Sequence, residues 1–486
     1  MENKRKNSSP KKKIKLSIIG VLLSLLFTGM NISLVVLLNT LNIIPDKYYK
    51  LLIICLILIN IILNFFLSLK FKNKVLKVFK VLSYIFSIIL IILFTIGIIY
   101  LNKTMNLFDN ISIIKEEVTN YYLIVLNDSN YQEASDLYGK TMAYFELTDK
   151  EVINRIKLDL TYSEEKDLLT LKNKLLNKEV ESILISDIIK NRYEEDDETF
   201  NQNTRILKTI FIKKEIEDIT KRVSIKNTPY NILISGIDTF GDINNAARND
   251  VNIVATVNPN TNEILLTSIP RDYYVQLHDK PGYKDKLTHA SYYGINTAIK
   301  TIEDIFDIDI NYYIKVNFTT VIDLVNKIGG IEVYADQAVS LYGCPRIKVG
   351  INKLNGACAL AFSRERYSYS DGDRHRGRNQ QEVIQAIFKK LSSGTTIFTQ
   401  YTDILDALEG KFATNMDMNE ITNFLKYEFS ELNDYTFKSI QVDGTGSMGK
   451  TYSYPNQDLW IMIPDQKTID NAKIQINKVL NNESIK

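Results

Sequence analysis

Three charge-free apolar runs in the first 102 residues constrain this chain more than any other feature. They are Leu16–Pro45, Leu51–Leu69 and Val81–Asn102, with 30, 19 and 22 residues. A helix rises about 1.5 Å per residue, so each run is long enough to cross the roughly 30 Å hydrocarbon layer of a membrane. The sequence therefore predicts three transmembrane helices and excludes a purely cytosolic protein.

The lysines and arginines around these runs predict their orientation. Seven basic residues precede the first run, and five lysines with no acid lie between the second and the third. Because basic residues are retained on the cytoplasmic side, the N-terminus and the second loop are expected inside the cell and everything after Asn102 outside. A cleaved signal peptide is the alternative for the first run. That run is too long for a signal h-region and lacks an A-x-A cleavage site.

Overall charge and cysteine usage exclude several classes of function. The chain has 59 basic and 57 acidic residues, so no polycation indicates a nucleic-acid partner. Its three cysteines form no CxxC pair, which excludes a cysteine-based zinc or iron–sulfur site. Cys344 and Cys358 both lie in the external part. A disulfide and two buried thiols remain equally compatible with the sequence, which does not show whether the Cα atoms approach.

Composition and periodicity divide the chain into five parts. These are a cytoplasmic basic tail (1–15), a membrane anchor (16–102), an external accessory domain (104–228), a second external domain (229–475) and a tail (476–486). The accessory part is rich in Lys, Glu and Asp, with a buried-strand pattern at Tyr121–Leu126 and helical period at Ile153–Leu160 and Leu168–Leu176.

In the second external domain, strand patterns alternate with helix patterns. The predicted strands are Ile232–Ile237, Val251–Val257, Glu263–Ile269 and Tyr312–Phe318. The predicted helices are Ala290–Phe306, Thr319–Ile328, Arg378–Leu391 and a later one marked by Met418, Ile421, Leu425 and Phe429. This alternation predicts external α/β (α+β) domains in which helices cover a sheet.

Charged side chains follow or precede three of these strands. Asp238 directly follows the first strand, Arg248 and Asp250 precede the second, and Arg271 with Asp272 ends the third. A distant segment, Phe362–Gln381, contributes five more arginines: Arg364, Arg366, Arg374, Arg376 and Arg378. Arginine grips phosphate bidentately, so arginines beside carboxylates suit a phosphorylated substrate with a divalent metal. No Walker A or G-x-G-x-x-G sequence supports a nucleotide site.

Less specific interpretations of the same residues stay open. An isolated Arg–Asp pair is most often a surface ion pair. The segment RERYSYSDGDRHRGR could be an exposed basic loop that binds an acidic polymer. His375 alone is expected to face solvent rather than act as a ligand or base.

These segments resemble the LytR–CpsA–Psr family. The resemblance starts with NILISGIDTFGDINNAARNDVNIVATVNPNTNEILLTSIPRDYYV (231–275), followed in the family's order by KLTHASYYG, YYIKVNF, IGGIEV, LNGACALAFSRERYS and GDRHRGRNQQEVI. VDGTGSMGKTYSYPNQDLWIMIPD (442–465) resembles the family's closing segment. The three spans and the domain at 104–228 resemble capsule-type members, in which an accessory domain precedes the catalytic one.

The resemblance implies a membrane-anchored phosphotransferase whose catalytic domain, 229–475, lies outside the cell and has a central mixed sheet covered by helices. Such proteins attach an anionic glycopolymer, of capsule or teichoic acid type, from its undecaprenyl-pyrophosphate carrier to peptidoglycan. Two alternatives are a prenyl-pyrophosphate hydrolase that uses the same site and a non-catalytic membrane sensor or regulator. The apolar residues between Ala290 and Val333 could hold the prenyl tail, but an ordinary core is the default for them.

Motif positions in the resemblance imply roles for individual residues. The catalytic residues are Arg271, Arg364, Arg366, Arg376 and Asp250, the last also being the candidate general base. The substrate-binding residues are Arg248, Lys286, Arg378 and Gln380. Asp238 and Asp250 match the acids associated with Mg²⁺. One departure is visible: where the family often has an acid before the Arg of its R-G-R-N-Q segment, this chain has His375, preceded by Arg374.

Overall fold

The structure is a computed structural model that describes residues 16–111, 116–197, 199–237, 243, 248–280, 282, 284–392, 400–431 and 435–484. The chain divides into two compact units. The first comprises Met1–Phe108 and Ile421–Glu431, and the second comprises Asp109–Glu420 and Leu432–Lys486. Each unit is described by itself.

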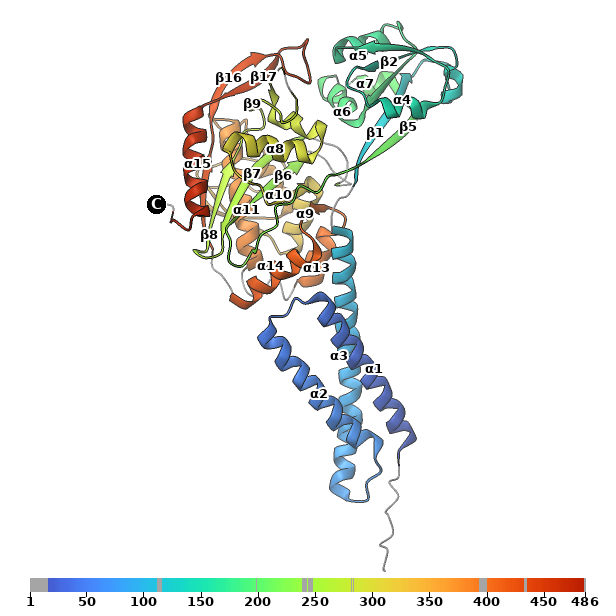
Figure 1. Ribbon diagram of the computed structural model, residues 1–486, viewed down its shortest axis with the longest axis vertical. Coiled ribbons are helices and arrows are strands. Elements are labelled where there is room, and N and C mark those ends of the chain that lie inside the picture. The colour runs from blue at the N-terminus through green and yellow to red at the C-terminus, as the bar shows by residue number, and fades with distance from the viewer. Residues whose placement is uncertain are drawn as a thin grey trace, which may run out of the picture. The chain divides into compact units, whose positions relative to one another are not determined.

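Three apolar helices, α1 (Ile18–Leu41), α2 (Asp46–Ser68) and α3 (Lys74–Ile111), account for most of the first unit (Figure 1). All three are long and apolar enough to cross a membrane, as predicted. The third begins earlier than the sequence pattern indicates, because Lys74 starts the helix instead of ending a loop. Long lysine side chains can reach the head-group layer from a helix end, so the lysines do not terminate the helix.

Polar and aromatic side chains join the apolar helices to one another. Asn64 of α2 accepts a hydrogen bond from Ser24 of α1 at 2.6 Å and donates one to Thr28 at 2.9 Å. Phe27 of α1 stacks on Phe94 of α3 with ring centroids 5.7 Å apart. Such contacts hold helices together where no water competes for the polar groups.

The accessory domain is built on a five-stranded mixed sheet in the order β3-β2-β4-β1-β5. Its strands are β1 (Glu116–Leu126), β2 (Thr141–Phe145), β3 (Thr161–Glu165), β4 (Ser182–Ser186) and β5 (Thr204–Glu215). Its helices are η1 (Ala134–Leu137), α4 (Lys150–Ile156), α5 (Leu168–Leu176), α6 (Asp187–Asp196) and α7 (Phe200–Asn203). The helical period at Ile153–Leu160 is cut short because Lys157 adopts a left-handed conformation, with φ of 53°.

The domain that follows contains a six-stranded mixed sheet in the order β14-β11-β6-β7-β8-β15. The strands are β6 (Tyr230–Ile237), β7 (Asn249–Asn258), β8 (Glu263–Ser268), β11 (Tyr312–Asn317), β14 (Phe412–Thr414) and β15 (Thr436–Gln441). β6 pairs with β11 in parallel and with β7 antiparallel. The predicted fold class, a mixed sheet after three apolar helices, is therefore confirmed.

Helices cover both faces of this sheet (Figure 1). On one face, α8 (Ile295–Phe306) and α15 (Gln466–Leu480) share a hydrophobic core with β6, β7 and β8. On the other lie α9 (Phe318–Lys327), α10 (Gly356–Arg364) and α11 (Asp373–Ser392). Helices α13 (Tyr401–Leu408) and α14 (Met418–Glu431) follow them in the chain. Val479 of α15 is fully buried, so the boundary predicted at 476 falls within a packed helix.

Three short two-stranded sheets complete the domain. They are β9 (Tyr274–Val275) with β10 (Asp285–Lys286), β12 (Ile331–Ala335) with β13 (Gly350–Leu354), and β16 (Gly444–Gly449) with β17 (Leu459–Pro464).

The helix predicted at Ala290–Phe306 is interrupted. Leu287–Tyr293 forms a 3-10 helix, η2, and α8 starts only after Gly294, whose φ is 101°. Glycine reaches this conformation without the steric cost that a Cβ would bring. The interruption leaves the segment 287–293 free to run beside β7, where it meets the candidate site.

Cys344 and Cys358 form a disulfide with a Cα–Cα distance of 5.7 Å. The bond joins the loop between β12 and β13 to the start of α10. Of the two alternatives left by the sequence, the structure therefore selects the disulfide.

Candidate functional site: arginines at the mouth of an apolar cavity

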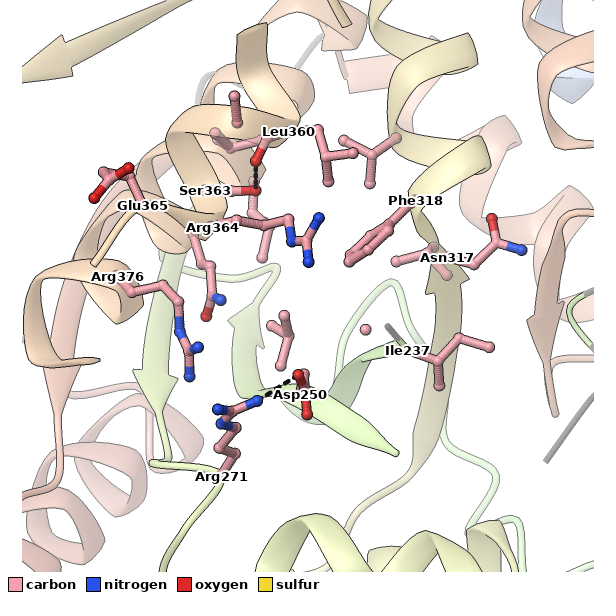
Figure 2. A pocket seen from close by; sticks show the side chains of 18 of the residues that line it. Ile237, Asp250, Arg271, Asn317, Phe318, Leu360, Ser363, Arg364, Glu365 and Arg376 are labelled. Atoms are coloured by element: carbon pink, nitrogen blue, oxygen red, sulfur yellow. Dashed lines mark hydrogen bonds and ion pairs between the residues drawn. The ribbon is translucent and has the colours of Figure 1, made fainter. Parts of the chain in front are cut away.

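A cavity of about 410 Å³ lies between the catalytic sheet and the helices α9, α10 and α11 (Figure 2). Its charged lining residues are Asp250, Arg271, Arg364, Glu365, Arg366 and Arg376. Its apolar lining includes Ile234, Ile237, Val251, Val316, Phe318, Val321, Leu360, Val383 and Ile384. One compartment thus joins a cluster of arginines to a hydrocarbon-like interior.

Arg271 and Asp250 form the central ion pair of the site. Arg271 follows β8, and its Nη1 donates a hydrogen bond to Oδ2 of Asp250, on β7, at 2.6 Å. The backbone carbonyl of Arg271 accepts a hydrogen bond from the Thr288 amide at 2.8 Å. The Thr288 hydroxyl lies 3.4 Å from Oδ1 of Asp250. Both partners of the ion pair are therefore held by η2 as well as by the sheet.

The electrostatics of Asp250 are dominated by the surrounding arginines. Burial alone would raise the pKa of this carboxyl group, but the charges of Arg271, Arg248 and Arg376 outweigh burial and hold its pKa below the usual value. Asp250 is consequently ionised at neutral pH. Arg248 directly precedes β7 and contributes to the site through this charge, although it does not line the cavity.

Helix α11 supplies the second group of charges. Arg376 donates a hydrogen bond to Asp373, one turn earlier, at 2.7 Å, and Arg366 lies 3.7 Å from the same carboxylate. Gln380 follows Arg376 by four residues, so the two share one helix face and both line the cavity. Burial and the nearby charge of Arg271 lower the pKa of Arg376, which shows that the arginines are close enough to repel one another.

Arg364 ends α10 and projects into the same space from the side that lies across from Arg271 (Figure 2). Its guanidinium carbon lies 4.2 Å from the ring centroid of Phe318, the first residue of α9. This cation–π contact places a charged group at the boundary between the arginine cluster and the apolar interior.

Most apolar residues that line the cavity lie outside Ala290–Val333, the segment in which the sequence analysis looked for a prenyl site. Of the lining residues, only Val316, Asn317, Phe318 and Val321 belong to the range 290–333. The other aliphatic lining residues come from β6, β7, α10 and α11, which are distant in sequence.

Of three further predicted site residues, two lie outside the cavity lining and one lies outside the described residues. Lys286 does not line the cavity, and its Nζ lies 2.5 Å from Oδ1 of Asp272, next to Arg271. Arg378 also lies outside the lining and donates a hydrogen bond to Asp371 at 2.6 Å. Asp238 lies outside the residues that the structure describes.

The expectation that His375 faces solvent is wrong. Its side chain is almost completely buried, stacks on Tyr369 with ring centroids 3.4 Å apart, and lies 3.1 Å from Asp336. Arg374 bonds to Asp443 at 2.6 Å and does not reach the cavity. Both residues therefore position the start of α11 and do not add charge to the site.

Three contributors to the site escaped the sequence analysis: Thr288, Phe318 and Asp373. Asp373 lies three residues before Arg376, a common pairing distance on a helix, but the helix predicted from the sequence begins only at Arg378, whereas α11 begins at Asp373. Thr288 and Phe318 offered no signal, since their contacts depend on how η2 and α9 pack against other segments.

The chemistry of the site is compatible with Mg²⁺ bound together with a substrate. Within the described residues, no group of three or more His, Cys, Asp and Glu side chains could hold a metal ion. Mg²⁺, however, commonly binds through one or two carboxylates plus substrate phosphates and water. Asp250 provides one such carboxylate at the cavity mouth.

Comparison with known proteins gives consistent matches to the catalytic part of the chain. A profile of the LytR_cpsA_psr family matches residues 198–473. A polyisoprenyl-teichoic acid–peptidoglycan teichoic acid transferase TagU of Enterococcus faecalis is 35% identical over 243 residues, which cover 49% of this chain and 78% of that protein. A protein of the same name from Bacillus cereus is 34% identical over 230 residues, covering 47% of this chain and 73% of that protein.

Solved structures also match about half of the chain. The structure named "TagT bound to LI-WTA" is 26% identical, with 54% of this chain and 94% of that chain covered and a TM-score of 0.42. Crystalline TagU of B. subtilis is 27% identical, with 54% and 100% covered and a TM-score of 0.41.

Proposed function

Because the chain belongs to the LytR_cpsA_psr family, we propose that it is a phosphotransferase that moves an anionic glycopolymer from a polyprenyl-diphosphate carrier to peptidoglycan. One observation carries the proposal: a single cavity is lined by several arginines and by many apolar side chains. A polyprenyl diphosphate combines a charged part and an apolar part that match these two kinds of lining. The glycopolymer is of teichoic acid type, as the names of the relatives suggest, or of capsule type.

The arrangement suits attack on a diphosphate. An acceptor hydroxyl oxygen forms a bond to the phosphorus that carries the glycan, the bond from this phosphorus to the bridging oxygen breaks, and prenyl monophosphate leaves. Negative charge grows on the bridging and equatorial oxygens, and preorganised guanidinium groups stabilise it. Arg271 and Arg376 approach from the sheet and from α11, while Arg364 and Arg366 approach from the end of α10.

The carboxylates of the site take part in two ways. Asp250 and Asp373 hold Arg271 and Arg376 in place in the absence of substrate. Asp250, ionised at neutral pH, is also the group that receives the hydroxyl proton. Asp250 with Asp238 would hold Mg²⁺, which when bound supplies further compensation for diphosphate charge.

The remaining residues assigned from the family motifs support the site in different ways. Gln380 lines the cavity and can donate to a phosphate oxygen. Arg248 adds positive charge beside Asp250. Lys286 acts through Asp272 on the position of Arg271, and Arg378 acts through Asp371 on the loop before α11.

The location of the reaction follows from the anchor. We place the N-terminus in the cytoplasm and the catalytic domain on the outer face of the membrane, because most of the basic residues that flank the apolar helices lie on one side. Peptidoglycan and the lipid-linked polymer are available on that face.

A reconstituted assay tests the proposal against its two alternatives. Full-length protein in lipid nanodiscs receives labelled polyprenyl-diphosphate glycopolymer and purified peptidoglycan. A transferase makes label appear in insoluble peptidoglycan with release of prenyl monophosphate. A hydrolase consumes the donor equally well without acceptor and leaves all label soluble, whereas a sensor binds the donor without consuming it; either result would refute the proposal.

A further inference from the structure

The hairpin of β12 and β13, together with the loop that joins them, exposes large apolar side chains; we call residues 331–355 the hairpin surface. Tyr334 and Ile351 are cross-strand neighbours and are 52% and 68% exposed. Val349 is 63% exposed, and Tyr342 is fully exposed. Single exposed apolar residues are ordinary, but four on one hairpin form a patch that indicates a binding partner.

The loop of the hairpin surface is basic, whereas its first strand carries Glu332, the cross-strand neighbour of Lys353, and is followed by Asp336. Between residues 337 and 355 there is no Asp or Glu, whereas Arg346, Lys348 and Lys353 all fall in this stretch and are exposed. In the part of the chain that the structure describes, none of the three belongs to an ion pair. These cations are therefore available to an external anion.

A second cavity, of about 390 Å³, opens beside these cations. Arg346 and Lys353 line it, together with Asn326, Asn355 and the backbone of Gly329 and Gly330. No carboxylate is among its lining residues. Two cations and side-chain amides around a cavity of this size suit a phosphate-sized anionic group.

The loop is fixed in shape, so it presents these side chains without first having to be ordered. The Cys344–Cys358 disulfide ties it to α10, and Val339 and Ile347 exchange two backbone hydrogen bonds of 3.2 and 2.9 Å. A preorganised surface loses little conformational entropy when it binds.

We propose that the hairpin surface docks the catalytic domain on an anionic lipid surface, with Tyr342, Val349 and Ile351 among the head groups and a lipid phosphate at Arg346 and Lys353. A hydrophilic phosphate polymer could pair with the cations, but it would offer nothing to exposed aliphatic side chains. The boundary between head groups and acyl chains accommodates aromatic, aliphatic and basic groups together. The docking does not depend on the transfer reaction, because the anchor alone keeps the domain near a bilayer.

Brominated lipids provide the test, because they quench tryptophan fluorescence at short range. The full-length chain, placed in nanodiscs that contain anionic lipid, first has its single tryptophan removed by Trp460→Phe. Tyr342→Trp then reports on the hairpin surface, and Tyr138→Trp, 68% exposed in the accessory domain, is the matched control. Docking predicts strong quenching of the reporter at position 342 and little at position 138.

Charge neutralisation separates docking from chance proximity. Replacing Arg346, Lys348 and Lys353 by Gln removes three cations, each worth about 1 kcal/mol near an anionic surface, so the docked-to-undocked ratio should fall on the order of a hundredfold. The control replaces Lys140, Lys166 and Lys467, which are equally exposed, and should leave quenching unchanged. Three results would overturn the proposal. Both reporters could be quenched equally, the reporter at position 342 could remain unquenched, or it could respond to soluble glycopolymer and not to lipid.

Discussion

At the scale of single residues, the site is a group of neighbouring arginines that carboxylates hold in place. Arg271 bonds to Asp250 and Arg376 bonds to Asp373, while the charge of Arg271 lowers the pKa of Arg376. An incoming diphosphate adds negative charge beside several guanidinium groups, and these opposite charges attract one another more strongly in a partly buried site than in water.

We expect Arg271→Lys and Arg364→Lys each to lower turnover by roughly tenfold to a thousandfold, the scale of losing one preorganised transition-state donor. Lysine keeps the charge but lacks the bidentate fork, so binding of the lipid-linked donor should fall less than turnover. Single-turnover rates and donor affinity, measured on the same nanodisc preparations, separate the two effects. Arg155→Lys, on an exposed ion pair of the accessory domain, is the control. Unchanged turnover in both site variants would remove these arginines from the reaction.

A buried polar cluster next to the site predicts a pH dependence of stability. Asp285 accepts hydrogen bonds from the amide and hydroxyl of Ser453, and its other oxygen lies 2.6 Å from Nδ1 of His289. Burial lowers the pKa of His289 below its usual value despite the neighbouring carboxylate. The unfolded chain therefore binds a proton at His289 more readily than the folded chain does.

The consequence is that stability contributed by His289 is fully present above pH ~6.5 and is lost as the pH falls from there toward the lowered native pKa. His289→Gln can still donate to Asp285 but does not titrate, so its melting temperature should decline less between pH 7 and pH 5 than that of the wild type. His278→Gln, at a partly exposed His–Asp pair, serves as control. Parallel declines in all three proteins would contradict the prediction.

The sequence predicted which residues line the cavity better than it predicted which partners their side chains contact. Asp250, Arg271, Arg364, Arg366, Arg376 and Gln380 all line the cavity. The failures have a common cause. Whether Lys286 faces a substrate or Asp272, and whether His375 faces water or Tyr369, depends on segments more than one turn away, which no local spacing encodes.

At the scale of elements, the contact between α9 and α10 determines where Arg364 lies. Gly356 begins α10 against the backbone of α9, where an added Cβ would lie only 2.1 Å from the carbonyl oxygen of Ile322. Gly356→Ala must therefore push the two helices apart. Overpacking of this kind costs about 1–3 kcal/mol.

Because Arg364 ends the displaced helix, Gly356→Ala should also lower turnover while the other site arginines keep their positions. Denaturant unfolding of the detergent-solubilised chain measures the stability, and the nanodisc assay measures the turnover. Ala357→Ser, at the exposed neighbouring position, should change neither quantity. A stable and fully active Gly356→Ala variant would show that α9 and α10 do not approach as described.

The disulfide of the hairpin surface contributes stability in a different way. It closes a loop of 15 residues, so removing it by Cys344→Ser and Cys358→Ser should cost about 3 kcal/mol, mainly by freeing the unfolded chain. Intact-mass measurement of the wild type should show two hydrogens fewer than after reduction. Cys55→Ser should leave stability unchanged, and alkylation of all three cysteines without reductant would contradict the bond.

Elements with strong periodicity were predictable, and their ends were not. β6, β7 and β8 fall within two residues of the sequence-based limits because alternating or continuous apolar runs define a strand locally. The division of the helix at Gly294 required a positive φ that the sequence does not announce. The early start of α3 at Lys74 depends on lysine side chains reaching past the apolar layer, which a charge-free window overlooks.

At the scale of the whole molecule, the three apolar helices would anchor the protein in the membrane that holds the proposed donor, the polyprenyl-diphosphate-linked glycopolymer. A prenyl tail is costly to expose to water, so transfer from the bilayer to an apolar cavity is far easier for an anchored protein than for a diffusing one. This arrangement works only if the catalytic domain and the peptidoglycan share one side of the membrane. The orientation of the helices is therefore the property on which the proposed function most depends.

The lysine distribution predicts that orientation, and cysteine labelling in intact cells measures it. In a Cys55→Ser background, with Cys344 and Cys358 bonded, Lys140→Cys in the accessory domain should react with a membrane-impermeant maleimide. Lys74→Cys, at the start of α3, should react only after the membrane is permeabilised, because a loop with five lysines and no acid stays in the cytoplasm. The opposite accessibility would place the catalytic domain in the cytoplasm, away from peptidoglycan. In that case the site could still bind a prenyl diphosphate, but it could not carry out the transfer proposed for it.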